Sequence, residues 1–272
     1  MTEILRLAAF SDDPKGGNPA GVVLDAAGLD GERMQDIAAE VGYSETAFVV
    51  SGDGDRYRVR YFSPLAEVPF CGHATIATAV ALGPGRHVFV TNAGEVPVAV
   101  DDAGVATLTS VDPSVADLSD ADLTALLAAL RWSSADLDET LPPRVAYAGA
   151  YHPILAVGSR QRLAGLDYDV PALKALMESR DWTTIQLVFR AGDDTFDVRN
   201  PFPVGGVYED PATGAAAAAL GAYLRELWIA PDDATLHLRQ GDDLGRPSRL
   251  TVQLTPGEPG VRVSGRAVPI EA

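Results

Sequence analysis

A short segment of this 272-residue chain occurs twice, about half a chain length apart. Residues 67–74 read EVPFCGHA and residues 209–216 read EDPATGAA, so Glu, Pro, Gly and Ala recur at an offset of 142. Such a period is typical of a protein built from two similar units. A chance match between two Ala-rich helices is the alternative, but Glu, Pro and Gly match before the Ala run begins. The sequence therefore predicts two copies of one unit, in which strands and a Gly-ended loop lead into a helix of small side chains.

The repeat continues upstream and is followed by strand-rich sequence in both copies. Val59-Arg60 recurs as Val198-Arg199, shifted by three residues relative to the main offset. Helical spacing and stop signals predict helices over 30–41, 74–82, 117–130, 171–179 and 215–227. Alternating or short apolar runs predict strands over 4–10, 21–24, 46–50, 57–62, 88–91, 96–100, 144–150, 153–157, 184–189, 195–199, 235–239, 249–254 and 261–264.

Composition narrows the class of partner. Apolar residues make up 47% of the chain, enough for a proper core, and the net charge of −17 disfavours nucleic acid. Residues 1–10 lack the pattern of a secretory signal, and the longest apolar run, 215–224, is too short to cross a membrane. The single cysteine, Cys71, cannot form an internal disulfide, which fits a reducing compartment. We therefore expect a cytoplasmic enzyme that acts on a small molecule.

Each copy of the repeat places a glycine, Gly72 or Gly214, where a helix is expected to start. The first N–H groups of a helix have no acceptor within it and carry a partial positive charge, so they bind anions. Two such helix starts facing each other could hold a carboxylate and stabilise enolate-like charge on the adjacent carbon. The pattern indicates proton abstraction next to a carboxylate.

Three titratable residues near these positions are candidates for acid–base chemistry. His73 could relay a proton near neutral pH, or be a capping or core histidine. Asp210 could act beside the second helix start, although a plain N-cap is the favoured reading of the residue alone. Glu45, at the entry to an apolar strand, could be a general base or acid if partly buried. For Glu45 the residues alone favour an exposed loop carboxylate.

Other chemistry finds less support in the sequence. Cys71 could be a thiolate at a helix start, but its mirrored position is Thr213, so a mechanism with two thiols is excluded and a buried, inert cysteine is favoured. Phosphate-binding, dinucleotide-binding and zinc-protease motifs are missing. The four histidines are scattered without ligand spacing. We expect neither a metal nor another cofactor.

Motifs spread over nearly the whole chain resemble those of the phenazine-biosynthesis PhzF-like family, within the diaminopimelate epimerase-like superfamily. The matching residues are Phe10, GNPAGV at 17–22, SETAF at 44–48, FSP at 62–64, EVPFCGHAT at 67–75, EDPATG at 209–214, QG at 240–241, GRPS at 245–248 and 261–268. They occur in the order of the family, and the combination is highly specific.

The resemblance implies an α+β fold of two pseudo-symmetric lobes. Each lobe is expected to be a mostly antiparallel sheet curled around a central helix, with the site in the cleft. We place the N-terminal lobe at residues 1–115, with the last strand, 265–272, returning to it, and the C-terminal lobe at 116–264. The resemblance also implies a homodimer, which members of the family often form.

The resemblance further implies an isomerase that shifts a proton within a small, cyclic carboxylic acid without a cofactor. Glu45 would remove and return the proton, and His73 and Asp210 would assist. The residues expected to bind the substrate, its carboxylate in part through backbone N–H groups, are Asn18, Gly72, Thr213, Gly214 and Ala215, with the N–H group of His73. Ala215 departs from the family member that makes phenazines, which has Ser there. Loss of a donor to a charged group costs about 1.5–3 kcal/mol, enough to change the substrate.

Two other functions stay open on the sequence alone. One is a binding or interaction protein without catalysis that keeps the fold and the anion site. A cleft that holds an anion while Glu45 is locked in a structural ion pair would favour it. The other is a one-base hydrolase or lyase, which would need an ordered water beside Glu45 or Asp210.

Overall fold

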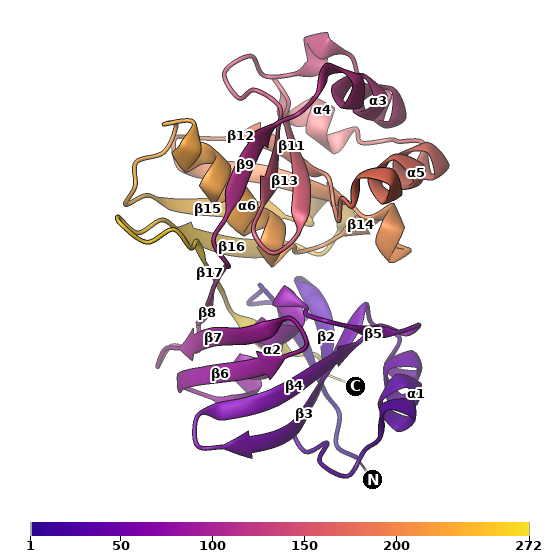
Figure 1. Ribbon diagram of the computed structural model, residues 1–272, viewed down its shortest axis with the longest axis vertical. Helices are drawn as coiled ribbons and strands as arrows, with labels where there is room; N and C mark the ends of the chain where they lie inside the picture. Colours follow the sequence, from indigo (N-terminus) through magenta and orange to yellow (C-terminus); the bar gives the residue numbers. More distant parts are fainter. Residues whose placement is uncertain (1, 272) are drawn as a thin grey trace. The chain divides into compact units, whose positions relative to one another are not determined.

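The computed structural model describes residues 2–271 of the protein (Figure 1). By its internal contacts the chain divides into two compact units. The first comprises residues 1–109, 246–249 and 264–272, and the second comprises residues 110–245 and 250–263.

The first unit contains a mixed sheet with the hydrogen-bonded order β18-β1-β2-β3-β4-β6-β7-β8, and β5 also pairs with β4. The pairings β2–β3 and β4–β6 are parallel, and the others are antiparallel. The strands are β1 (Leu5–Ala9), β2 (Asn18–Val23), β3 (Glu45–Asp53), β4 (Arg56–Phe62), β5 (Glu67–Val68), β6 (Gly85–Thr91), β7 (Gly94–Val100), β8 (Ala106–Thr109) and β18 (Ala267–Pro269).

Helix α2 (Gly72–Leu82) lies inside this sheet, in contact with β1, β2, β3, β7, β8 and β18. Its side chains are small, and Ala74, Ala77 and Ala79 are fully buried. Small side chains let strands approach the helix closely from several directions. Helix α1 (Gly31–Val41) contacts β3 and β4, and its buried side chains join a separate apolar cluster with residues such as Phe48 and Phe62.

The second unit contains a sheet with the order β9-β10-β11-β12-β13-β15, and β14 also pairs with β13. Helix α6 (Gly214–Glu226) contacts β9, β10 and β11. Helices α3 (Asp120–Leu130), α4 (Arg160–Ala164) and α5 (Val170–Arg180) contribute to a second apolar cluster. The strands of this unit are β9 (Ser114–Asp117), β10 (Arg144–Tyr147), β11 (Tyr151–Ala156), β12 (Gln186–Arg190), β13 (Thr195–Pro201), β14 (Glu209–Asp210) and β15 (Thr235–Gln240). The strands β16 (Ser248–Gln253) and β17 (Arg262–Gly265) each have residues in both units.

The two units share one succession of elements. In the first unit β1–β2 is antiparallel, β2–β3 parallel, β3–β4 and β4–β5 antiparallel, and β4–β6 parallel. Strands β10 to β15 repeat the same senses in the same order. Helix α2 follows β5, and α6 follows β14. The predicted repeat and the α+β class are therefore confirmed.

An arginine–glutamate pair explains why these two residue types recur in both copies. In the first unit Arg60 on β4 donates from Nε and Nη2 to the two carboxylate oxygens of Glu67 on β5, both at 2.8 Å. In the second unit Arg199 on β13 makes the equivalent pair with Glu209 on β14, at 3.0 and 2.5 Å. The first pair is partly exposed, whereas the second is buried. Each pair joins the end of a long strand to the short strand that leads to the Ala-rich helix.

Some sequence-based boundaries were wrong. Asp117 was placed in a helix but belongs to β9, which pairs with β10, and α3 begins only at Asp120. The Ser119 hydroxyl caps this helix by accepting from the N–H of Asp122. Strand β8 and helix α4 were not predicted. None of the helices within residues 2–271 is both long enough and apolar enough to cross a membrane.

Candidate active site

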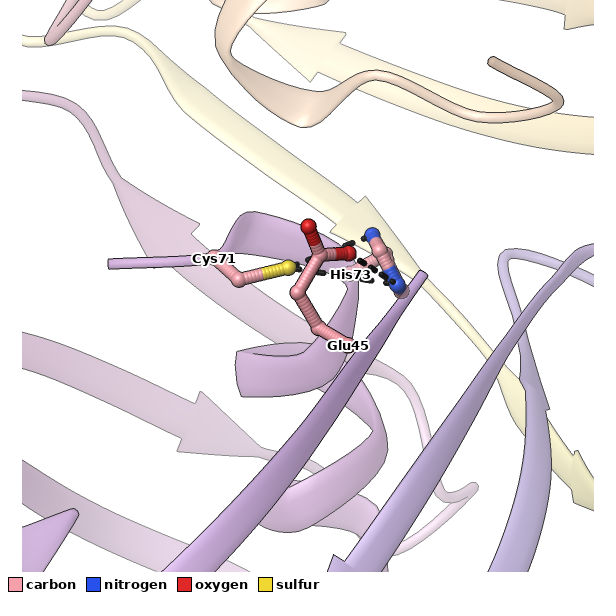
Figure 2. A group of neighbouring side chains, drawn as sticks. All are labelled: Glu45, Cys71 and His73. Atoms are coloured by element: carbon pink, nitrogen blue, oxygen red, sulfur yellow. Dashed lines mark hydrogen bonds and ion pairs between the residues drawn. The ribbon is translucent and has the colours of Figure 1, made fainter. Parts of the chain in front are cut away.

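Glu45 is the first residue of β3, which begins shortly after α1 ends at its left-handed C-cap, Gly42. Its side chain is only 16% exposed, and Oε2 lies 3.4 Å from Nε2 of His73 (Figure 2). The exposed loop carboxylate favoured by the residues alone is therefore wrong. Glu45 lies opposite Ala20 of the neighbouring parallel strand β2, and this pairing places the carboxylate beside the start of α2.

His73 lies in the first turn of α2 and is 6% exposed. Its Nδ1 is 3.2 Å from the amide nitrogen of Asn18, and its Nε2 is also 3.4 Å from the Ser44 hydroxyl. Because an amide nitrogen can only donate, Nδ1 accepts and Nε2 carries the proton, which lies beside both the Ser44 hydroxyl and the Glu45 carboxylate. Burial lowers the pKa of His73, and the nearby Glu45 carboxylate only partly opposes this. The imidazole is therefore neutral at pH 7.

Asn18, which orients this imidazole, is 1% exposed and opens β2. The preceding loop is held from the far end of the chain, because Arg246 donates from Nε to the Gly17 carbonyl and from Nη2 to the Gly16 carbonyl, both at 2.8 Å. Gly17 has φ +64, and a Cβ there would lie 2.5 Å from the Ala9 carbonyl oxygen. Arg246 and Pro247 of the GRP motif thus meet the GNP motif within the first unit and position Asn18.

Cys71 is the N-cap of α2 and is buried, as expected. Its Sγ lies 3.3 Å from Nδ1 and 3.9 Å from Nε2 of His73. Glu45, Cys71 and His73 each offer one ligand atom, and these atoms all lie within 4.8 Å of one another. The spacing of the histidines in the sequence does not indicate this cluster, because the distant strand β3 supplies its carboxylate.

The second unit has a polar arrangement at the start of α6. Asp210 lies in β14, and its Oδ2 accepts from the Thr213 hydroxyl at 2.6 Å. Gln240 on β15 donates to the Asp210 carbonyl at 2.7 Å and accepts from the Thr213 N–H at 3.1 Å. The N-cap of α6 is Thr213, so the reading of Asp210 as a plain N-cap is wrong. Gln240 was not predicted as a site residue, although it belongs to a quoted family motif.

The predicted site residues thus form two groups in the described chain. Asn18, Glu45 and His73 are in contact in the first unit, beside Gly72 at the first residue of α2. Asp210 and Thr213 are in contact in the second unit, beside Gly214 at the first residue of α6. Ala215 follows in the first turn of α6 and is partly buried. Neither N-cap side chain bonds to its helix, so both helix starts keep N–H groups that suit an anion.

The repeated sheet-and-helix unit defines the class of protein as one with a diaminopimelate epimerase-like fold. The family model described as "Phenazine biosynthesis-like protein" matches residues 7–272, and the chain belongs to this family. The expected resemblance is confirmed.

Relatives agree with this assignment. The Escherichia coli (strain K12) protein named "Uncharacterized isomerase YddE" is 33% identical over 98% of this chain and 95% of its own. A Pseudomonas aeruginosa relative named "Trans-2,3-dihydro-3-hydroxyanthranilate isomerase" is 34% identical over 92% and 89% of the two chains. The crystal structure of a Bacillus anthracis phenazine biosynthesis protein of the PhzF family covers 99% of this chain and 97% of its own, with a TM-score of 0.89 and 27% identity. The protein is an isomerase of this family, which argues against the non-catalytic, hydrolase and lyase alternatives.

Proposed function

We propose that the protein shifts a proton within a small, cyclic carboxylic acid, with Glu45 as the acid/base group and no cofactor. The observation that carries this proposal is the contact of 3.4 Å between Glu45 and His73 at the start of α2. A carboxylate that is partly buried, yet still reached by solvent, can receive a proton from a substrate and return it. The neutral His73 holds this carboxylate from one side without competing for the proton.

The reaction needs two proton transfers and one place for negative charge. Glu45 removes a proton from a carbon next to the conjugated carboxylate, and the electron pair left behind spreads into that carboxylate. The N–H groups of Gly72 and His73 stabilise this charge at the helix start. Glu45, now protonated, returns the proton to a different carbon of the same system, which completes the isomerisation and restores the enzyme.

In the second unit we assign supporting roles to Asp210 and the start of α6. Asp210, held by the Thr213 hydroxyl, assists in proton handling and orients the substrate. The N–H groups of Gly214 and Ala215 offer a second place for a carboxylate. Because Ala215 brings no hydroxyl, a substrate oxygen at this point loses a donor, which favours a different substrate from that of relatives with Ser.

The name of the Pseudomonas aeruginosa relative supports the substrate class. It is named as an isomerase of trans-2,3-dihydro-3-hydroxyanthranilate, a cyclic carboxylic acid. We propose that the present protein acts on an acid of this kind. The residues that would bind it, and so determine which substituents it can carry, are Asn18, Gly72, Thr213, Gly214 and Ala215.

The test is proton exchange in deuterium oxide. The purified protein is incubated with a panel of cyclic dienol and amino-substituted carboxylic acids, and NMR follows carbon-bound protons and new products. Glu45→Gln should abolish the reaction, whereas Glu40→Gln, a matched change on the exposed face of α1, should leave it intact. Equal reaction by wild type and Glu45→Gln would contradict the role of Glu45. Isomerisation without deuterium uptake would indicate that Glu45 returns the same proton.

Independence from cofactors and a homodimer belong to the same proposal. Protein treated with a chelator and passed through a desalting column should keep its full rate of isomerisation. Light scattering should give twice the chain mass of 28.6 kDa. A rate that returns only when a metal is added would overturn the independence from cofactors. A measured mass equal to that of a single chain would overturn the homodimer.

A further inference from the structure

Figure 2 shows Glu45, Cys71 and His73 pointing toward one another at the start of α2. The Nε2 atom of His73 is 3.4 Å from Glu45 Oε2 and 3.9 Å from Cys71 Sγ. The proposed acid/base reaction uses Glu45 and His73 but gives the thiol no role. A carboxylate, a thiol and an imidazole that converge from two segments form a different kind of site, namely a set of metal ligands.

The separations suit a tetrahedral ion. Zinc binds sulfur at about 2.3 Å and nitrogen or oxygen at about 2.0–2.2 Å, which places tetrahedral ligand atoms roughly 3.4–3.6 Å apart. The two separations that involve Nε2 lie within a few tenths of an ångström of this range. The three ligand atoms lie within 4.8 Å of one another, and Sγ is nearer to Nδ1, at 3.3 Å, so rotations of the Cys71 and His73 side chains that bring Sγ toward Nε2 would complete the geometry.

The charge and softness of the ligands select the ion. A thiolate and a carboxylate together balance a divalent cation, and a neutral imidazole adds no charge. Thiolate and imidazole favour Zn²⁺ and Co²⁺ over Mg²⁺ and Ca²⁺, which prefer oxygen ligands only. Three protein ligands leave a fourth position for water. When Nε2 binds the ion, Nδ1 carries the proton, and a turn of the Asn18 amide would present its oxygen as the acceptor that a metal-bound histidine usually has.

We propose that Glu45, Cys71 and His73 form an inhibitory site for Zn²⁺ and chemically similar divalent ions. The inhibitory part rests on the proposed function, because the ion occupies the carboxylate that removes the substrate proton. Bound Zn²⁺ and substrate therefore exclude each other. The binding part stands on the geometry of the three side chains alone.

Binding is tested directly on the full-length, metal-free protein. Zn²⁺ is titrated in competition with a chromophoric chelator, and Co²⁺ is added separately as a spectroscopic probe. We expect one ion per chain and a cobalt spectrum with a thiolate-to-metal charge-transfer band. Cys71→Ala should raise the Kd for Zn²⁺ at least about 100-fold and abolish that band, since loss of an outer-shell partner alone costs up to about 100-fold. His237→Asn, an exposed histidine on β15, is the control and should change neither.

Two results would overturn the site. One is the same Zn²⁺ affinity in wild type and Cys71→Ala, and the other is a cobalt spectrum without sulfur ligation. Inhibition is then measured on the proton-exchange reaction, where substrate at concentration S should raise the apparent inhibition constant of Zn²⁺ by the factor 1 + S/KM. Zn²⁺ that binds through Cys71 without any proton exchange by the metal-free protein would contradict the proposed function but not the site. Exchange that depends on Glu45 and is insensitive to Zn²⁺ would contradict the inhibitory site only.

Discussion

The Nδ1 atom of His73 lies 3.2 Å from the side-chain nitrogen of Asn18, a residue 55 positions earlier in the chain. The amide donates to Nδ1 and so leaves the ring proton on Nε2, which faces Glu45. The tautomer of the imidazole is therefore set by one residue at the start of β2.

Replacing Asn18 should therefore change the rate through the protonation of the His73 ring. In Asn18→Asp the new carboxylate accepts from Nδ1–H while the Glu45 carboxylate still lies beside Nε2–H, so the imidazole takes up a second proton and becomes positively charged. We expect kcat to fall at least about tenfold with a smaller change in KM, because a positioned proton partner contributes about 10²-fold or more. Nitrogen NMR of the histidine should report a proton on both ring nitrogens in this variant, against a proton on Nε2 alone in wild type. A single proton on Nε2 in Asn18→Asp would contradict the assignment. The kcat of Asn18→Ala, which removes the donor without adding a charge, should lie between those of wild type and Asn18→Asp.

Arg246 should act on the same group from a distance. Its two hydrogen bonds hold the carbonyls of Gly16 and Gly17 and so fix the loop before Asn18. Arg246→Lys cannot reproduce both bonds, since lysine has no planar pair of donors. We expect faster amide hydrogen exchange in residues 11–18 and a lower kcat, measured by mass spectrometry and by the proton-exchange reaction. Arg33→Lys, on the exposed side of α1, is the matched control, and equal exchange in both variants would contradict this role.

The two arginine–glutamate pairs should differ strongly in their contribution to stability. Glu209→Ala leaves the guanidinium of Arg199 buried without its carboxylate, which costs about 3–5 kcal/mol of unfolding free energy. Glu67→Ala breaks the equivalent pair at Arg60, where both side chains are more than a quarter exposed, and should cost about 1 kcal/mol or less. Urea unfolding of both variants measures the difference. Equal losses would show that burial does not distinguish the two pairs.

His152 should make the protein sensitive to mild acid. It is fully buried in β11, its Nδ1 bonds to the Thr184 hydroxyl, and burial lowers its pKa to about 4. The unfolded chain, with a pKa near 6.5, takes up a proton between pH 6.5 and pH 4 while the folded protein does not, so stability is lost as the pH falls through this window. We expect this residue to lower the free energy of unfolding by about 2 kcal/mol between pH 7 and pH 5.

The measurement is the urea midpoint at several pH values. His152→Gln should lower stability at pH 7 but flatten its dependence between pH 6.5 and pH 4. The matched variant His237→Gln changes an exposed histidine and should keep the slope of wild type. A slope that survives in His152→Gln would assign the acid sensitivity to other groups.

Much of the fold could be predicted from local sequence. The helices around Ala74 and Ala215 were predicted from their composition, and the glycines before them from the repeat, because small side chains and helix starts are local properties. The boundary at Asp117 failed because its extended conformation depends on pairing with β10, a contact with residue 144 that local propensity does not record. The prediction of an exposed carboxylate at Glu45 was wrong for a similar reason, since its burial comes from contact with His73 and the start of α2.

The sequence by itself determined the repeated unit, the two helix starts and the residue types that can carry acid–base chemistry. It could do so because periodicity, glycine and small side chains act over a few neighbouring residues. Only the tertiary structure decided which of these residues meet. Asn18, Glu45, Cys71 and His73 come from separate segments, and the segment at Arg246 that steadies them is 229 or more residues away from its partners. Such contacts follow from sheet register and strand order, which arise from packing of the whole unit.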